Sequence, residues 1–191
     1  DRDARTITLS QELYVKTFLA RFAPYLDQSN ARSFDVPALD EINSFTINDC
    51  PAEGSAEYEQ MRPLWHVYMQ IVGGLIWLTS VSFPHLCVAT MKLSRFTINP
   101  HPKHFAALMR ILLYLGKHTN ESLTLGGKGP NVEVLQIVTD ASHETEASMS
   151  GVLILMGAAV IDWICRRQKS TARSSLESEA LSSAEGAQDG I

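Results

Sequence analysis

Two acidic residues, Asp140 and Glu179, stand where a protein could hold a divalent metal ion. Asp140 directly follows Val134-Leu-Gln-Ile-Val-Thr139, an apolar run typical of a buried strand. Glu179 lies in Ser174-Ser-Leu-Glu-Ser-Glu-Ala-Leu181, where a serine can cap the start of a helix. Carboxylate oxygens are the ligands that Mg²⁺ prefers. A strand that delivers an Asp against a helix that delivers a Glu therefore raises the hypothesis of metal-dependent phosphodiester chemistry.

Each carboxylate also has an ordinary structural interpretation. An Asp just past a strand is common as a turn residue or a helix cap. Glu177 and Glu179 lie in the first turns of the expected helix, where carboxylates favour the helix dipole without any function. Glu179 shares a helix face with Leu176 and Ser183, which favours Glu179 as the residue that faces the sheet. Spacing alone leaves the catalytic and the structural interpretations open.

Basic residues are concentrated in the middle of the chain. The net charge is −5, yet residues 61–132 hold seven Lys or Arg and one acid, whereas residues 1–60 hold eleven acids against five bases. The basic segment could face a polyanion, and a solvated helix face is the alternative. The run from Arg166 to Arg173 suits phosphate contacts, although an ordinary solvated turn would look much the same. We expect phosphate contacts from Lys92, Arg95, Lys103, Arg110, Arg166, Arg167, Lys169 and Arg173.

The expected elements change from helical to β along the chain. Polar and apolar residues alternate in Arg5–Leu9, which predicts a strand. Ser10 can cap a helix that ends by Pro24. Apolar residues at helical spacing recur twice more after residue 80. Those two helices run from Ser82-Phe-Pro84 to about Phe96 and over His104–His118. Three strands follow at Val134–Thr139, Ser150–Met156 and Ala159–Arg166, and then a helix capped by Ser174 or Ser175. Short turns between consecutive strands predict an antiparallel meander.

The segment from Leu64 to Met91 contains no Asp, Glu, Lys or Arg, which is long enough to span a bilayer. Polar residues and Pro84 interrupt it, so we expect a buried helical hairpin that begins with a helix over Leu64–Thr79, and no membrane span. Within that helix, Gly73-Gly74 predicts a close helix crossing or a kink. The preceding residues 25–58 are polar and turn-forming, and a loop that long is functional, disordered or an arm over a neighbour.

The three cysteines, Cys50, Cys87 and Cys165, lie far apart without a paired spacing. That distribution indicates reduced thiols in an intracellular protein and no zinc site. The expected location is the cytoplasm or nucleus, with an organelle as an open alternative. The chain starts at Asp1-Arg-Asp, without a signal peptide or an initiator Met. We therefore expect a piece of a longer polypeptide or a processed product.

Several segments in the second half of the chain together resemble a known family. These are Thr139-Asp-Ala-Ser142, Ser150-Gly-Val-Leu153, Asp162-Trp-Ile-Cys-Arg-Arg-Gln-Lys169 and Ala172-Arg-Ser-Ser-Leu-Glu-Ser-Glu-Ala-Leu181. In order and spacing they look like the DxS, SGY-like, W-x-S-K-K/R-Q and S-S-x-E-A-E motifs of the ribonuclease H domain in copia-type (Pseudoviridae) retrotransposon polyproteins. Upstream, Ile7-Thr-Leu-Ser-Gln-Glu-Leu-Tyr14 is similar to the family's I-x-L-S-Q-x-x-Y, so the resemblance covers nearly the whole chain.

The resemblance implies an α+β protein with three parts. Residues 1–125 would be a mainly helical thumb and connection region of reverse transcriptase with a long loop at 25–58. Residues 126–131 would be a linker, and residues 132–191 an incomplete ribonuclease H domain formed by the truncated three-stranded meander and its helix. By motif position, Asp140 and Glu179 match catalytic, metal-binding residues. Such sites hold two Mg²⁺ ions that hydrolyse the RNA strand of an RNA–DNA hybrid, whose phosphates the basic helices would follow.

Departures from the family pattern indicate that this chain is catalytically incomplete. The paired aspartates of the polymerase palm and the third catalytic Asp, in a D-N-x motif, have no match here. Phe83-Pro-His85 replaces the usual R-P-D, and His143 stands where an aromatic residue is usual. The alternative is a non-catalytic structural or interaction subunit of a larger protein or nucleoprotein assembly. The truncated sheet edge and the loop at 25–58 would then dock to other protein chains.

Overall fold

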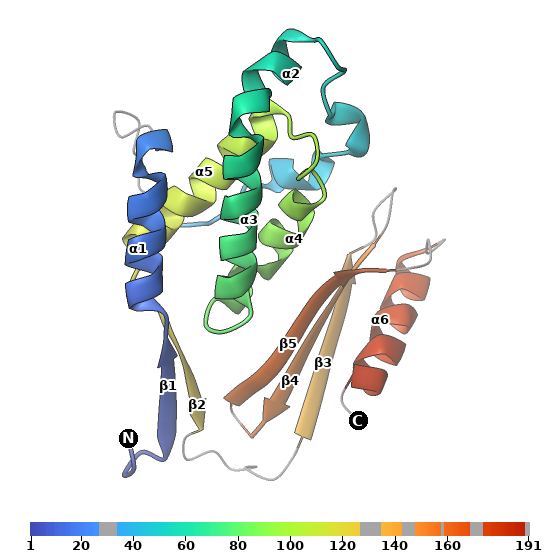
Figure 1. Ribbon diagram of the computed structural model, residues 1–191. Helices are drawn as coiled ribbons and strands as arrows, with labels where there is room; N and C mark the ends of the chain where they lie inside the picture. The colour runs from blue at the N-terminus through green and yellow to red at the C-terminus, as the bar shows by residue number, and fades with distance from the viewer. Residues whose placement is uncertain (27–33, 127–134, 143–147, 158, 169–173, 190–191) are drawn as a thin grey trace. The chain divides into compact units, whose positions relative to one another are not determined.

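The computed structural model describes residues 1–26, 34–126, 135–142, 148–157, 159–168 and 174–189 (Figure 1). Its contacts divide the chain into two compact units, Ser10–Leu123 and a second unit that combines Asp1–Leu9 with Thr124–Ile191. The sequence analysis grouped residues 1–125 together. The structure assigns the first nine residues to the other unit because the first strand pairs with a strand that ends at Gly126. The expected linker at 126–131 lies outside the described residues after Gly126.

The unit Ser10–Leu123 is helical. Its helices are α1 (Glu12–Phe22), α2 (Ala56–Met61), α3 (Trp65–Thr79), α4 (Cys87–Ser94) and α5 (Pro102–Lys117). The apolar faces of α1, α3, α4 and α5 meet in one core, in which Tyr68, Leu75, Leu93 and Leu108 are fully buried. The buried hydroxyl of Tyr68 donates to the carbonyl of Leu93 at 2.8 Å, which ties α3 to α4. No helix in the described ranges is both long and apolar enough to cross a bilayer.

Gly74 allows α1 to cross α3 closely, as the glycine pair predicted. A Cβ atom placed on Gly74 would lie 2.1 Å from Cε2 of Phe18, a core residue of α1. A Cβ atom on the exposed Gly73 would meet nothing within 4 Å. Only one member of the pair is therefore required by packing, since the ring of Phe18 occupies the space that a side chain at residue 74 would need.

The described part of residues 25–58 is more ordered than the sequence analysis expected. It contains 3₁₀ turns at Asp40–Ser44 and Ile47–Asp49 and the start of α2. Ile42 and Phe45 are buried in the helical core. These two apolar side chains are too sparse to create a periodic signal, so the sequence indicated a loop where the structure has a segment packed on its own unit.

The short strand β1 (Thr6–Ser10) pairs with β2 (Ser122–Gly126) in a two-stranded sheet. The strand at β1 was predicted, but β2 was missed because its five residues, Ser-Leu-Thr-Leu-Gly, precede a glycine-rich stretch typical of a linker.

The predicted meander and its helix are present in the other unit. Strands β3 (Leu135–Ser142), β4 (Met149–Met156) and β5 (Ala159–Arg167) form an antiparallel sheet in the order β3-β4-β5. The helix α6 (Ser175–Asp189) packs against β3 and β4 (Figure 1). The backbone N–H of Glu177 donates to the Ser174 hydroxyl at 3.2 Å, so Ser174 serves as the expected helix cap. The molecule is α+β with antiparallel sheets, as predicted.

Candidate metal and nucleic-acid site

Asp140 lies near the end of β3, opposite Gly151 of β4, with an exposed side chain. Its neighbour Thr139 faces α6, because the Thr139 and Ser183 hydroxyls are hydrogen-bonded at 3.2 Å. Successive side chains of a strand point to opposite faces. The carboxylate of Asp140 therefore leaves the sheet on the face that α6 does not cover.

Glu179 reaches the strand beside Asp140. Its Oε1 accepts a hydrogen bond from the backbone N–H of Ala141 at 3.4 Å. The hydroxyl of Ser182, one helical turn further along α6, donates to the carbonyl of Asp140 at 2.8 Å. The two side chains from α6 thus hold both polar groups of the peptide bond between Asp140 and Ala141. The structure brings the two predicted site residues together through this peptide bond.

Gln168 fixes the start of α6 in the same place. Its buried side-chain amide donates to the carbonyl of Ser178 at 2.8 Å and to the hydroxyl of Ser150 at 3.1 Å. The hydroxyl of Ser178 is in turn hydrogen-bonded to that of Ser148 at 2.9 Å. Since Ser178 directly precedes Glu179, this network orients the backbone that carries the carboxylate. The sequence analysis included Gln168 in the W-x-S-K-K/R-Q motif without assigning it a role.

Small residues let α6 lie close to the sheet. Ser178, Ser182 and Gly186 recur at every fourth position and all are buried, so they form one face of the helix. A Cβ atom on Gly186 would lie 2.4 Å from Cγ2 of Thr139. Hydrogen bonds and close backbone approach, more than large apolar side chains, hold this helix on the sheet.

The described residues do not form a complete metal site. They contain no group of three or more His, Cys, Asp or Glu side chains arranged to hold an ion. One oxygen of Glu179 is engaged by the N–H of Ala141, and the carboxylate of Asp140 projects from the other face of the sheet. Mg²⁺ needs six oxygen ligands in near-octahedral geometry. Asp140 and Glu179 could supply only part of such a set, and we derive no catalytic step through the ion.

Two of the predicted phosphate ligands on α4 and its end are engaged within the protein. Lys92 is buried, and its ammonium group donates to Oδ1 of Asn43 at 2.8 Å. The guanidinium of Arg95 lies 5.6 Å from the ring centre of Phe96. In this arrangement Lys92 supports the packing of residues 40–44 and does not present its charge to solvent.

Lys103 and Arg110 of α5 also bind residues of their own unit. Lys103 forms an ion pair of 2.7 Å with Asp49. Arg110 donates to the backbone carbonyl of Val36 at 3.3 Å and stacks 3.8 Å from the ring centre of Phe34. Hydrogen bonds from Lys103 and from the Thr46 backbone lower the pKa of Asp49. The uneven charge of the sequence is therefore balanced partly inside the helical unit.

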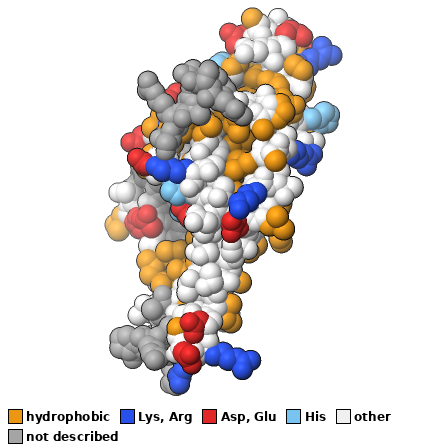
Figure 2. All heavy atoms as spheres, turned by 90° about the vertical axis from the view of Figure 1, so that its left-hand side faces the viewer, with side chains coloured by type: hydrophobic (Ala, Val, Ile, Leu, Met, Phe, Trp, Pro, Cys, Tyr) orange, Lys and Arg blue, Asp and Glu red, His pale blue; other side chains and the backbone are white. Residues whose placement is uncertain are grey.

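The remaining predicted phosphate ligands belong to the end of β5. Arg166 forms an ion pair of 3.3 Å with Glu185 of α6, whereas the side chain of Arg167 is exposed. Lys169 and Arg173 lie outside the described residues. On the molecular face seen in Figure 2, the described Lys and Arg side chains are scattered among acidic ones and form no continuous basic patch. Cys50, Cys87 and Cys165 form no disulfide bond.

Comparison with known proteins finds relatives of this chain among retrotransposon polyproteins. The chain is 28% identical over 189 residues to the retrovirus-related Pol polyprotein from transposon TNT 1-94 of Nicotiana tabacum. It is 34% identical over 116 residues, or 59% of its length, to the corresponding polyprotein from transposon RE1 of Arabidopsis thaliana. The chain is thus similar to copia-type retrovirus-related Pol polyproteins of plant transposons. The resemblance inferred from the motifs is thereby confirmed.

The chain is much shorter than these Pol polyproteins. Its match to the TNT 1-94 polyprotein covers 97% of this chain and 13% of that protein, and its match to the RE1 polyprotein covers 8% of that protein. A third relative is the secreted RxLR effector protein 161 of Plasmopara viticola. The two are 30% identical over 126 residues, which make up 65% of this chain and 89% of that protein. No protein-family model and no solved structure matches the chain.

Proposed function

We propose that this Pol chain is a reverse transcriptase and ribonuclease H segment that binds RNA–DNA hybrids. In this proposal residues 10–123 correspond to the thumb and connection region, and the unit with β3, β4, β5 and α6 corresponds to part of a ribonuclease H domain. Asp140 and Glu179 would be two of the carboxylates of a Mg²⁺ site. The chain alone would be catalytically incomplete.

One observation supports this proposal most directly: the contact of Glu179 with the strand that carries Asp140. The carboxylate of Glu179 lies 3.4 Å from the backbone N–H of Ala141, and Ser182 and Gln168 hold the surrounding backbone. Residues from two distant motifs thus meet at the peptide bond between Asp140 and Ala141, although the Asp140 carboxylate leaves the sheet on the other face. The exposed carboxylate of Asp140 is accessible to a substrate. A Mg²⁺ ion bound by one or two carboxylates commonly takes its other ligands from water and substrate phosphates.

Binding and cleavage of a labelled RNA–DNA hybrid, with and without Mg²⁺, test the proposal. We expect binding that weakens as salt is raised, because phosphate contacts release counterions, and no RNA cleavage by this chain alone. Mg²⁺ should strengthen binding, and Asp140→Asn should abolish that gain. Asp162→Asn is the matched control, since Asp162 is an exposed carboxylate of the same sheet. The proposal fails if the chain does not bind the hybrid, or if both variants respond to Mg²⁺ alike.

A second candidate function is a non-catalytic interaction subunit. It is favoured by the effector relative, in which the matched region makes up 89% of the whole protein. That relative is therefore a protein that consists almost entirely of the matched region. The same experiment separates the two candidates. Cleavage that depends on Mg²⁺ and is lost in Asp140→Asn would exclude the non-catalytic role, whereas the absence of hybrid binding would favour it.

A further inference from the structure

Three basic side chains stand in a row along α5. Lys103, Arg110 and Lys117 are spaced seven residues apart. Seven residues complete nearly two helical turns, so the three side chains share one face and follow one another at about 10 Å along the axis. We call these three residues the basic row. A regular line of cations on a helix is suited to contact with successive phosphates of a nucleic acid.

One stretch of the same unit covers the basic row. This stretch, residues 34–49, contains four carboxylates and no Lys or Arg, and we call it the acidic segment. Its C-terminal part is firmly attached: Ile42 and Phe45 are buried in the core, and Asp49 pairs with Lys103 at 2.7 Å. Asp49 also caps its own 3₁₀ turn. This part of the acidic segment belongs to the fold.

The N-terminal part of the acidic segment, residues 34–39, is attached through exposed polar groups and through Phe34 and Ala38, which are partly buried against the helical core. Asp35 pairs with Lys117 at 2.5 Å, although 85% of the Asp35 side chain and 46% of the Lys117 side chain are exposed. The guanidinium of Arg110 donates a hydrogen bond to the carbonyl of Val36 and stacks on the ring of Phe34. Solvent screens such an ion pair, so it contributes little to stability. Another anion can replace Asp35 on Lys117 at small cost.

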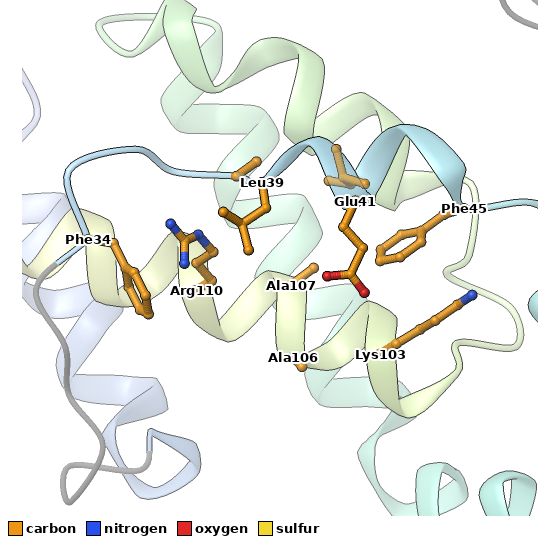
Figure 3. Close-up of a pocket in the computed structure, with 10 residues that line it drawn as sticks. Phe34, Leu39, Glu41, Phe45, Lys103, Ala106, Ala107 and Arg110 are labelled. Carbon is orange, nitrogen blue, oxygen red and sulfur yellow. The ribbon is translucent and has the colours of Figure 1, made fainter.

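Two surface pockets are lined by Phe34. The first, of about 280 Å³, lies between the acidic segment and α5 and is lined by Phe34, Leu39 and Ala107 among others (Figure 3). The second, of about 420 Å³, lies beyond Phe34 and is lined by residues that include Leu64 and Met109. Figure 3 shows Arg110 between Phe34 and Leu39, with the acidic segment crossing above the helix. Asp35, Val36 and Leu39 are exposed, and the core contacts that must break for these residues to leave are those of the partly buried Phe34 and Ala38.

We propose that residues 34–39 are a displaceable cover over Arg110 and Lys117, and that the phosphodiester backbone of a nucleic acid takes their place. Carboxylate and carbonyl oxygens of the cover occupy the positions that phosphate oxygens would take on these two cations. Lys103 keeps its partner Asp49, because that pair is anchored with the core. The inference rests on the proposed function and adds its regulation. The cover and the nucleic acid compete for Arg110 and Lys117, so only a ligand with enough negative charge to displace the cover binds there.

Hybrid binding by charge-matched variants tests this inference. Asp35→Asn removes the carboxylate of the cover and keeps its shape, so the affinity for a labelled RNA–DNA hybrid should rise about two- to fivefold, the range expected for losing one exposed ion pair. Asp40→Asn is the control, since Asp40 is an exposed carboxylate of the same segment and pairs with neither Lys103 nor Lys117. In a Lys117→Gln background the gain should vanish.

The outcomes separate this inference from the proposed function. Binding by all variants, with equal affinities for Asp35→Asn and Asp40→Asn, would overturn the cover and leave the proposed function standing. If no variant binds the hybrid, the proposed function fails and the cover with it.

Discussion

Replacing Gly74 by alanine should destabilise the helical unit, whereas the same change at Gly73 should stabilise it. Alanine favours a helix interior over glycine by about 1 kcal/mol, and this gain applies at both positions of α3. At Gly73 the new methyl group meets no atom within 4 Å. At Gly74 it would lie 2.1 Å from the ring of Phe18, which is buried and cannot move into solvent.

The difference between the two variants isolates the cost of the contact. Overpacking a tight core by one methyl group costs about 1–3 kcal/mol. The helix-propensity gain cancels in the comparison, so Gly74→Ala should be less stable than Gly73→Ala by about 1–3 kcal/mol, or roughly 5- to 150-fold in the unfolding equilibrium constant. Urea titrations followed by tryptophan fluorescence measure it, since Trp65 and Trp77 both lie in α3.

A double-mutant cycle identifies the cause. Phe18→Leu shortens the side chain that Gly74→Ala would strike, so the double variant should lose less stability than the two single changes together. Equal stabilities for Gly73→Ala and Gly74→Ala would refute the close crossing of α1 and α3. Additive effects in the cycle would refute Phe18 as its cause.

Three further measurements address the other unit and the titrating groups of the helical core. Gly186→Ala places a methyl group 2.4 Å from Thr139 Cγ2, so amide exchange across α6 should accelerate; unchanged protection would contradict the close approach of α6 to the sheet. Burial lowers the pKa of His104 from 6.5 to about 4. Between pH 6.5 and pH 4 the imidazole of His104 is therefore protonated in the unfolded state and neutral in the folded state. The free energy of unfolding should have its full value above pH 6.5 and fall by up to about 1.4 kcal/mol per pH unit toward pH 4. His104→Gln should remove this pH dependence. Burial, the charge of Glu121 and its hydrogen bond raise the pKa of Tyr114 to about 12. Glu121→Gln should lower that pKa toward 10, as followed by NMR of labelled tyrosine rings, and an unchanged value would show that burial acts alone.

The elements with strong periodicity could be predicted from the sequence. Helix α3 runs from Trp65 to Thr79, one residue from its expected start, and all three strands of the meander are present. These elements have many apolar positions at one period, so local pattern and tertiary packing agree. Strand β2 and the packed turns of residues 40–49 have too few apolar residues for such a signal, and they are stabilised by partners far away in the sequence.

The basic residues illustrate a limit of composition. A cluster of cations in the sequence indicated a polyanion or a solvated helix face. The structure adds a third possibility, because Lys103 pairs with Asp49 and Lys117 with Asp35, residues 54 and 82 positions earlier in the chain. That pairing depends on the acidic segment crossing α5, and no local pattern encodes the crossing. Lys117 was not among the predicted phosphate ligands, although its seven-residue spacing from Arg110 was a signal available in the sequence.

The motifs that suggested catalysis also build the fold, and this affects how they are tested. The amide of Gln168 and the hydroxyl of Ser182 hold α6 on the sheet, so replacing either by alanine should leave a buried group unsatisfied at a cost of about 1–3 kcal/mol. The side chain of Asp140 is exposed on the face opposite α6, so Asp140→Asn should change stability by less than about 0.5 kcal/mol. A loss of metal-dependent binding in Asp140→Asn at unchanged stability would therefore report on the chemistry of the site. The same loss in Gln168→Ala would report on folding, because packing alone accounts for its contacts.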